Sequence, residues 1–292
     1  MSLYWLGIAI GLLSGVSNNF GIVLEKKALN KLPDGKKVGR HLLKNPLWLM
    51  GFICNIIITT LLSFAAQFYI GPTLVPGLEA TGMIILIVGS LRLLKESIKA
   101  PELIGIGLMI AAIFFLSFSQ LAIDINATPT TDFLIRASIF TIIMILGILT
   151  VRILRRKFEN LRGILYALES GFMFSLNNFW IAPLLGTVDN VLGGTFETNT
   201  LILFIMAIIT LPIVNYLGIF LLQKALEFGQ ASSMRPIQQA PIQIVPLFYF
   251  FAIFFIPPPT IYSLPLALSG MVLILISMFL LSRRAAKLEA KK

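Results

Sequence analysis

The sequence predicts an all-α protein: a polytopic membrane helical bundle of about nine transmembrane helices in two inverted repeats, in one domain spanning residues 1–292. Two observations predict the helices. The chain is 57% hydrophobic and 12% charged, whereas soluble domains carry about 25% charged residues. Its apolar runs recur at lengths near the ~20 residues that a helix needs to cross a bilayer. A third observation predicts the repeats: a short pattern returns after about 160 residues.

Each apolar run is predicted to be a helix, because backbone that is exposed to lipid must satisfy its own hydrogen bonds. Charged and turn-forming residues separate the runs. The nine expected spans are residues 3–24, 47–69, 73–94, 102–122, 133–154, 163–185, 200–222, 230–254 and 260–281.

The loops between these spans predict the orientation of a multi-pass cell-membrane protein. Of the 23 lysine and arginine residues, 21 lie in alternate loops or in the C-terminal tail. The other loops carry Asp124, Asp132, Asp189 and Glu197 instead. Because cytoplasmic loops are enriched in basic residues, we expect the N-terminus outside and the C-terminus in the cytoplasm. An odd number of spans agrees with termini on opposite faces.

The recurring pattern lies in corresponding spans. The matched positions are 17–20 with 176–179, Asn55 with Asn215, Pro76 with Pro236, Glu79 with Gln239, and Ala80 with Ala240. We therefore expect one repeat at about 1–122, a connector helix at about 133–154 and a second repeat at about 163–282. Five crossings separate the repeats, so the second copy is expected to be inverted, as in many secondary carriers.

Composition excludes several function classes. The net charge of +10 comes mainly from short loops, a pattern of membrane orientation and not of nucleic-acid binding. With one histidine, His41, and one cysteine, Cys54, no zinc, haem or other cofactor is expected. Motifs of nucleotide hydrolysis and of nucleophilic catalysis do not appear, so an enzyme is not expected. The expected partners are the lipid bilayer and a small-molecule or ion substrate; a homodimer is left open.

Two asparagine pairs lie deep inside matched spans. Asn18 and Asn19, and their counterparts Asn177 and Asn178, lie about 15 residues into their spans, or ~22 Å from the entry face at 1.5 Å per residue. Polar groups within a bilayer are costly, so each needs a role. We expect the pairs to face each other and to bind substrate. The alternative is that they form hydrogen bonds that hold span 1 to span 6.

Three ionisable residues lie inside spans, away from the helix ends: Glu79, Glu169 and Arg235. Glu169 and Arg235 enter from the same face at similar depth, so we expect an ion pair or an inner gate between them. A fixed structural pair is the alternative. The only evident basic partner for Glu79 is Arg136. Because it otherwise lacks a partner, Glu79 is a candidate proton or cation site. If the protein carries a cation, Glu79 and Glu169 are the candidate metal ligands.

Span 8 is unusual because three prolines and three glutamines share one stretch: Pro236, Pro241, Pro246, Gln238, Gln239 and Gln243. Broken or kinked backbone at membrane depth is tolerated where it lines a cavity. Its counterpart, span 3, contains Pro72, Pro76 and Gly77. We therefore expect spans 1, 3, 6 and 8 to surround the pathway, with Gln239 among the binding residues.

Several motifs resemble a known family. Within residues 51–119, the segments 71–76 (Gly-Pro-Thr-Leu-Val-Pro) and 94–96 (Leu-Lys-Glu) resemble the drug/metabolite transporter superfamily. The segment 21–29 (Gly-Ile-Val-Leu-Glu-Lys-Lys-Ala-Leu) and the stretch 214–236 are similar to its NIPA-like magnesium transporter branch. The resemblance covers most of the chain. It implies a transporter with nine spans.

These features predict an integral membrane secondary transporter that moves a small polar solute by alternating access. Arg235 would attract a carboxylate of the solute, while Asn18, Asn178 and Gln239 orient it. The first alternative is a NIPA-like magnesium or divalent-cation transporter, because magnesium keeps much of its water and two carboxylates could suffice. The guanidinium of Arg235 would repel such an ion. The second alternative is a membrane scaffold that transports nothing.

The predicted orientation can be tested with reporter fusions. A fluorescent protein fused to the C-terminal tail, or inserted between spans 5 and 6, should fluoresce, because both sites are expected in the cytoplasm. An alkaline phosphatase inserted after Gly193, between spans 6 and 7, should be active. Non-fluorescent fusions at the first two sites together with an inactive phosphatase after Gly193 would contradict the predicted orientation.

Overall fold

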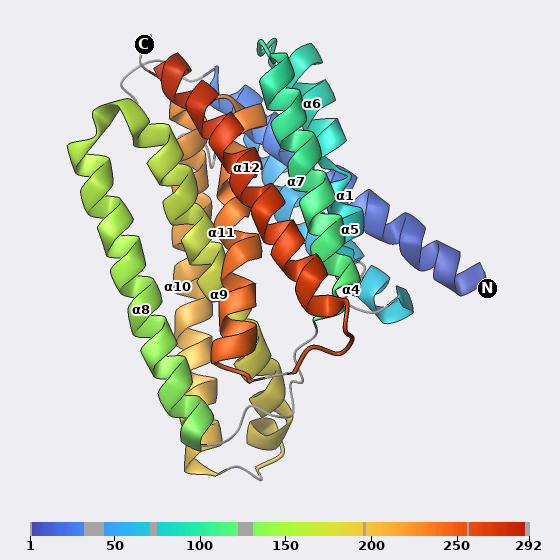
Figure 1. Cartoon of the computed structure of the whole chain (residues 1–292), viewed down its shortest axis with the longest axis vertical. Coiled ribbons are helices and arrows are strands. Elements are labelled where there is room, and N and C mark those ends of the chain that lie inside the picture. The colour runs from blue at the N-terminus through green and yellow to red at the C-terminus, as the bar shows by residue number, and fades with distance from the viewer. Residues whose placement is uncertain are drawn as a thin grey trace.

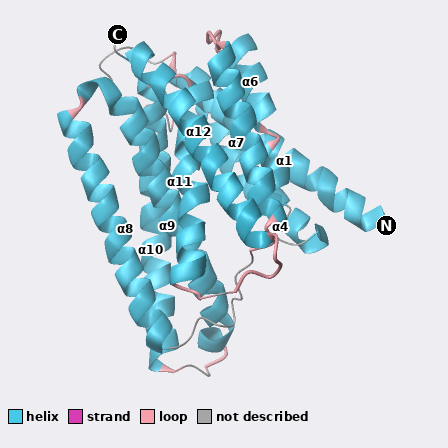
Figure 2. Cartoon of the chain, in the orientation of Figure 1, coloured by secondary structure: helices cyan, strands magenta, loops and turns pink. Residues whose placement is uncertain are grey.

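The computed structural model describes residues 2–31, 44–70, 75–121, 131–194, 197–255 and 257–289. Every regular element within these ranges is helical, and the helices pack into an elongated bundle (Figure 1). Figure 2 shows the same bundle coloured by secondary structure, with helices as the regular elements of the described residues. The predicted loop residues His41 and Asp124 and the proline Pro72 lie outside the described residues.

The helices follow the predicted spans and extend beyond most of them. Their bounds are α1 Ser2–Leu29, α3 Pro46–Phe52, η1 Ile53–Ile58, α4 Thr59–Ile70, α5 Val75–Ala80, α6 Met83–Arg92, α7 Ala100–Phe118, α8 Thr131–Lys157, η3 Glu159–Leu161, α9 Arg162–Leu192, α10 Thr198–Phe228, α11 Ala231–Ala252 and α12 Ser263–Glu289.

Six helical segments in the described ranges are long and apolar enough to cross a membrane. They are Leu3–Leu29, Pro46–Ala66, Ala100–Phe118, Asp132–Lys157, Thr198–Phe228 and Ser263–Lys287. The other three predicted spans correspond to α5 with α6, to α9 and to α11, which fall outside this test of length and hydropathy. The protein is thus a multi-pass membrane protein by these six segments, and the count of nine stays a prediction.

The outer face of α8 is apolar along its length. Ile135, Ile139, Ile142, Leu146 and Ile153 recur at helical spacing and are 51–65% exposed. Apolar surface on this scale is not stable in water. It is the surface expected of a helix that borders lipid, as the membrane assignment requires.

Charge distinguishes the two ends of the bundle. At the basic end, where α8 meets α9 and α12 ends, lie Arg155, Arg156 and Lys157 (Figure 1). The opposite, acidic end carries Asp132 at the start of α8 and Glu197 before α10. This division matches the predicted alternation of loops. Which end faces the cytoplasm stays a prediction.

Helix packing follows a similar scheme in the two halves of the chain. In the first half α1 packs against α3, α4 and α5, and α5 contacts α7; in the second half α9 packs against α10 and α11, and α11 contacts α12. The pair α7 and α12 joins the halves. This scheme is what a duplicated four-helix unit would produce. The inverted repeat itself stays a prediction.

The halves share an apolar core at the basic end and separate toward the acidic end. The shared core includes Ile22 and Met83 from the first half and Leu226 and Met234 from the second. A second core, rich in aromatic residues around Phe179, is built only from α8, α9, α10, α11 and the residues that follow α11. In Figure 1 the N-terminal part of α1 correspondingly diverges from the rest of the bundle.

Span 3 is broken, whereas span 8 is not. The helix α11 is continuous although it contains Pro236, Pro241 and Pro246, so span 8 is not broken at its prolines. In span 3 the helix breaks between α5 and α6, where the amide of Gly82 donates to the carbonyl of Glu79 in a tight turn. The break lies directly against Gly15 of α1.

The contact at this break requires glycine. A Cβ added to Gly82 would lie 2.0 Å from the carbonyl oxygen of Gly15, closer than any real contact. A Cβ added to Gly107 in α7 would meet nothing within 4 Å.

Gly82→Ala should therefore destabilise the protein by about 1–3 kcal/mol, the usual cost of overpacking, and lower its melting temperature in detergent by several degrees. Gly107→Ala is the matched control and should leave the melting temperature unchanged or slightly raised. Equal melting temperatures for the two variants would show that α1 and the α5–α6 turn are not in contact.

Candidate functional site

A cavity of about 550 Å³ lies between the two halves. It follows α11 from Arg235 to Leu247, a length of ~18 Å at 1.5 Å per residue. At its acidic-end side it reaches Leu121, just after α7. Helices of all four spans predicted to surround the pathway contribute to the wall, together with α4, α7 and α10.

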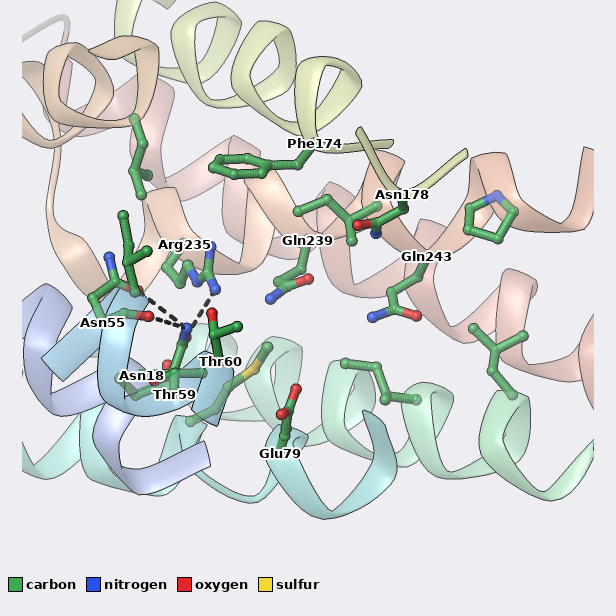
Figure 3. A pocket seen from close by; sticks show the side chains of 18 of the residues that line it. Asn18, Asn55, Thr59, Thr60, Glu79, Phe174, Asn178, Arg235, Gln239 and Gln243 are labelled. Carbon is green, nitrogen blue, oxygen red and sulfur yellow. Dashed lines mark hydrogen bonds between the residues drawn. The ribbon is translucent and has the colours of Figure 1, made fainter. Parts of the chain in front are cut away.

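Six of the eight predicted binding residues line this cavity: Asn18, Asn19, Glu79, Asn178, Arg235 and Gln239. Figure 3 shows Arg235, Asn18 and Asn55 gathered at one side, with Glu79 and Gln239 projecting from α5 and α11 into the space beside them. Asn177 and Glu169 are not among the lining residues. Sequence reasoning thus brought together residues that lie up to 221 positions apart in the chain.

Glu79 is held by hydroxyl groups from two neighbouring helices. Ser14 of α1 donates to Glu79 Oε1 at 2.7 Å, and Ser63 of α4 donates to the same oxygen. The two serine hydroxyls are themselves 2.9 Å apart. Within the described part of the chain, Glu79 is the one carboxylate that lines the cavity. Its hydroxyl partners fix the carboxylate without neutralising its charge, so it remains available to a cation.

Two amide oxygens of residues that line the same cavity as Glu79 lack hydrogen-bond donors. They are Asn19 Oδ1 and Gln239 Oε1, both buried within the protein. The amide nitrogen of Asn19 is engaged, because it donates to the carbonyl of Gly15 at 3.0 Å. A buried acceptor without a donor is costly and usually marks the place of a water or an ion. Together with the carboxylate of Glu79, the residues around the cavity therefore carry oxygen atoms of the kind that bind hard cations.

The mirrored asparagines bond to one another within each half, and Asn18 also accepts a hydrogen bond from Arg235 of the other half. Asn18 Nδ2 donates to Asn55 Oδ1 at 3.1 Å, and Asn215 Nδ2 donates to Asn177 Oδ1 at 2.6 Å. Each bond joins the first span of its half to the second. The alternative, in which these amides hold span 1 to span 6, is not what the structure shows, because Asn18 and Asn177 bond to residues of other spans. Asn177 is turned away from the cavity by the same pairing.

The predicted ion pair between Glu169 and Arg235 is not formed. Glu169 is fully buried and binds Arg152 of α8 at 2.9 Å and also Arg155. Arg155 in turn lies over the ring of Tyr166 at 3.9 Å from its centroid. Glu169 therefore joins α9 to α8 outside the cavity. It cannot share a cavity cation with Glu79, as the sequence had led us to expect.

Arg235 instead donates hydrogen bonds to one side-chain amide from each half of the protein. Its Nη2 donates to Asn18 Oδ1 at 2.8 Å, and its Nη1 donates to Gln238. Gln238 Nε2 then donates to Ser170 Oγ at 2.7 Å. Two of the guanidinium nitrogens are thus already occupied, which leaves less capacity to hold the carboxylate of a solute.

The sequence reasoning missed Glu25, Ser14 and Ser63. Glu25 was placed beyond the end of span 1, but α1 continues to Leu29 and buries Glu25 completely. A usable signal exists, because Glu25 follows Asn18 by seven residues and such positions share one helix face. Serines give no comparable signal, since they are common within membrane helices as packing residues.

The described residues contain no group of three or more His, Cys, Asp or Glu side chains that could enclose a metal ion. The cavity therefore does not have the ligands of a tight, fully dehydrated metal site. What it offers is one carboxylate, unpaired amide oxygens and room for water. This arrangement suits a weakly held, partly hydrated cation.

Comparison with known families agrees with this chemistry. A family model described as "Magnesium transporter NIPA" matches residues 2–287. The chain belongs to the NIPA magnesium transporter family. This family is part of the drug/metabolite transporter-like superfamily, so the resemblance drawn from the sequence motifs is confirmed. No curated protein and no solved structure matches the chain.

Membership in the NIPA family makes the chain a membrane transport protein, in agreement with the expectation that it is not an enzyme. It also favours the cation alternative over a carrier of small polar metabolites. The cavity geometry points the same way, because in the described part of the chain Glu79 bonds to hydroxyl groups and forms no salt bridge, whereas two nitrogens of Arg235 are already hydrogen-bonded.

The role assigned to Glu169 can be tested by stability. Glu169→Gln should lower the free energy of unfolding by about 2 kcal/mol, less than a wholly buried pair would lose because solvent screens Arg152, which is 37% exposed. The control Glu159→Gln breaks the exposed pair with Arg162 and should have almost no effect. Transport per folded molecule should be unchanged in both. A selective loss of transport in Glu169→Gln would return Glu169 to the pathway.

Proposed function

We propose that this protein transports magnesium, or a closely similar divalent cation, across the membrane by alternating access of its two halves around the central cavity. The observation that carries the proposal is the constellation of Glu79 with the unpaired oxygens of Asn19 and Gln239. Magnesium in proteins is bound mainly by carboxylates and water, and carbonyl oxygens also suit it. Membership in the NIPA family supports the same substrate class.

The size of the cavity supports transport of a hydrated ion. Six water molecules of about 30 Å³ each fill roughly a third of the 550 Å³ available. Magnesium dehydrates reluctantly and is commonly bound through one or two carboxylates. Glu79 would replace one or two of its waters, and the remaining shell would contact the amide groups of the wall.

The charge of Glu79 is well placed to offset the cost of an ion within the membrane. An isolated charge in a low-dielectric environment is expensive, and a neighbouring carboxylate lowers that cost by direct attraction. Ser14 and Ser63 keep the carboxylate in place when no ion is bound. A neutral amide at this position would keep the hydrogen bonds and lose the attraction.

Glu79→Gln should therefore reduce magnesium uptake into proteoliposomes by about tenfold or more, equivalent to at least 1.4 kcal/mol of lost ion binding. The same vesicles loaded with a fluorescent magnesium indicator give the initial rate. Glu159→Gln, an exposed residue far from the cavity, is the control and should transport at the normal rate.

Uptake of competing substrates distinguishes this proposal from the carrier of small polar solutes that the sequence analysis predicted. Wild-type vesicles that take up radiolabelled amino acids or other carboxylated solutes but no magnesium would overturn it, and would assign Arg235 the role of substrate ligand. Purified, folded protein that moves neither kind of solute would favour a scaffold without transport activity.

A further inference from the structure

At the basic-end side of the cavity, two buried charges are joined through two amides. Arg235 donates to Asn18 Oδ1 at 2.8 Å, Asn18 donates to Asn55 Oδ1 at 3.1 Å, and Asn55 donates to Glu25 Oε1 at 3.2 Å. We call these four residues the relay. Figure 3 shows its cavity side, with dashed bonds linking Arg235, Asn18 and Asn55.

The bonds of the relay all run in one direction, from the guanidinium to the carboxylate. Each asparagine accepts through its oxygen and donates through its nitrogen, so the amide dipoles align between the two charges and strengthen one another. Glu25 is fully buried and Arg235 is 9% exposed. Such charges are stable in a protein interior only when they are paired or hydrogen-bonded. The two asparagines of the relay hydrogen-bond the guanidinium and the carboxylate, and so stabilise both buried charges although the charges do not touch.

The relay also joins the two halves of the protein. Glu25, Asn18 and Asn55 belong to the first half and Arg235 to the second. A further donor from the second half, Gln223 of α10, binds the other oxygen of Glu25. Trp48 of α3 donates to Gln223 Oε1 at 3.2 Å. Gln223 of the second half is thus bonded to two residues of the first half, Trp48 and Glu25.

Other contacts between the halves lie at the same end. Lys26 donates to the carbonyl of Leu226 in the last turn of α10. Glu96 accepts from the amide of Ala231 at 2.8 Å and that of Ser232 at 3.2 Å, and so caps the start of α11. Together with the shared apolar core, these contacts close the basic end of the bundle.

The cavity itself lies on the other side of the relay. Asn18, Asn55, Gln223 and Arg235 are cavity-lining residues, but Glu25 and Trp48 are not, because they lie behind the closed wall. From the relay the cavity extends along α11 toward the acidic end, where the aromatic core of the second half includes no residue of α1 to α7. The structure thus corresponds to a carrier that is closed at its basic end.

We propose that the relay between Arg235 and Glu25 is the gate that closes the basic end of the transport pathway, and that opening at this end requires the bonds between Arg235, Asn18 and Asn55 to break. This inference rests on the proposed function only for the identity of the cation. While the relay is intact, the guanidinium repels a cation at that end of the cavity. Breaking the relay removes both the closure and this barrier.

Comparison of matched positions indicates that the opposite gate is built differently. If the predicted repeats hold, offsets of 159 and 160 relate Glu25 to Leu184, Gln223 to Ser63 and Arg235 to Val75. Neither charge of the relay has a charged counterpart. A closure at the acidic end would therefore be mainly apolar and would hold no buried ion pair.

The gate can be tested by thiol accessibility. The single cysteine is first removed by Cys54→Ser, and Thr60→Cys then places a thiol on an exposed wall position of the cavity. A membrane-impermeant methanethiosulfonate reagent should react from the face of the acidic end and be excluded from the face of the basic end. Sealed vesicles of known orientation, with and without reagent inside, separate the two faces.

Glu25→Gln and Arg235→Gln should each raise the labelling rate from the basic-end face by about tenfold or more, because they shift the population toward the open state. The control is Glu169→Gln, which removes a carboxylate of equal burial outside the cavity and should not change labelling. This control separates gate opening from general loss of stability. If Glu25→Gln or Arg235→Gln aggregates, Asn18→Leu is used in its place, because it breaks the bonds to Arg235 and Asn55 without changing the charge of the protein.

Three results would overturn the proposal: equal labelling of the parent protein from both faces, labelling of the parent from the basic-end face alone, or unchanged labelling in folded relay variants. None of these measurements needs magnesium. A protein that fails to transport magnesium but opens when the relay is broken would contradict the proposed function alone, whereas normal magnesium uptake with unchanged labelling would contradict the gate alone.

Discussion

The structure depends on one constraint, which is that a charge buried within a membrane protein needs compensation from its own chain. Arg235 and Glu25 are both buried, two asparagines connect them, and Gln223 of α10 also donates to Glu25. Meeting this requirement holds α1, η1, α10 and α11 at fixed positions relative to one another. The cavity, the closed basic end and the separation of the halves toward the acidic end all follow from where these helices meet.

The two halves use similar parts for different purposes. The bond between Asn18 and Asn55 has its counterpart in the bond between Asn177 and Asn215, and each joins the first two spans of its half. Only the first of these bonds continues to a carboxylate and a guanidinium. The second half instead gains rigidity from the aromatic core around Phe179. A symmetric scaffold thus carries asymmetric chemistry.

Much of the fold could be predicted from the sequence, because hydropathy and the distribution of charge reflect the membrane directly. The cavity residues Asn18, Glu79, Arg235 and Gln239 were also found, since polar groups are conspicuous in apolar helices. Pairing could not be predicted. The partner of Glu169 lies on α8, at a rotation that no spacing rule gives, and Glu25 was hidden because basic neighbours made its helical turn resemble a loop.

The contact between Gly15 and Gly82 has a mechanical consequence. The two glycines have no side chains and their backbones meet there, so this contact itself offers little resistance to a change of angle between α1 and the turn that joins α5 to α6. In a rocking motion about this point, displacement grows with distance from the fulcrum. Glu79 lies beside the fulcrum, since its own backbone also touches Gly15. The ends of α1 could swing widely while the carboxylate stays almost stationary, and one ligand could then serve both faces of the membrane.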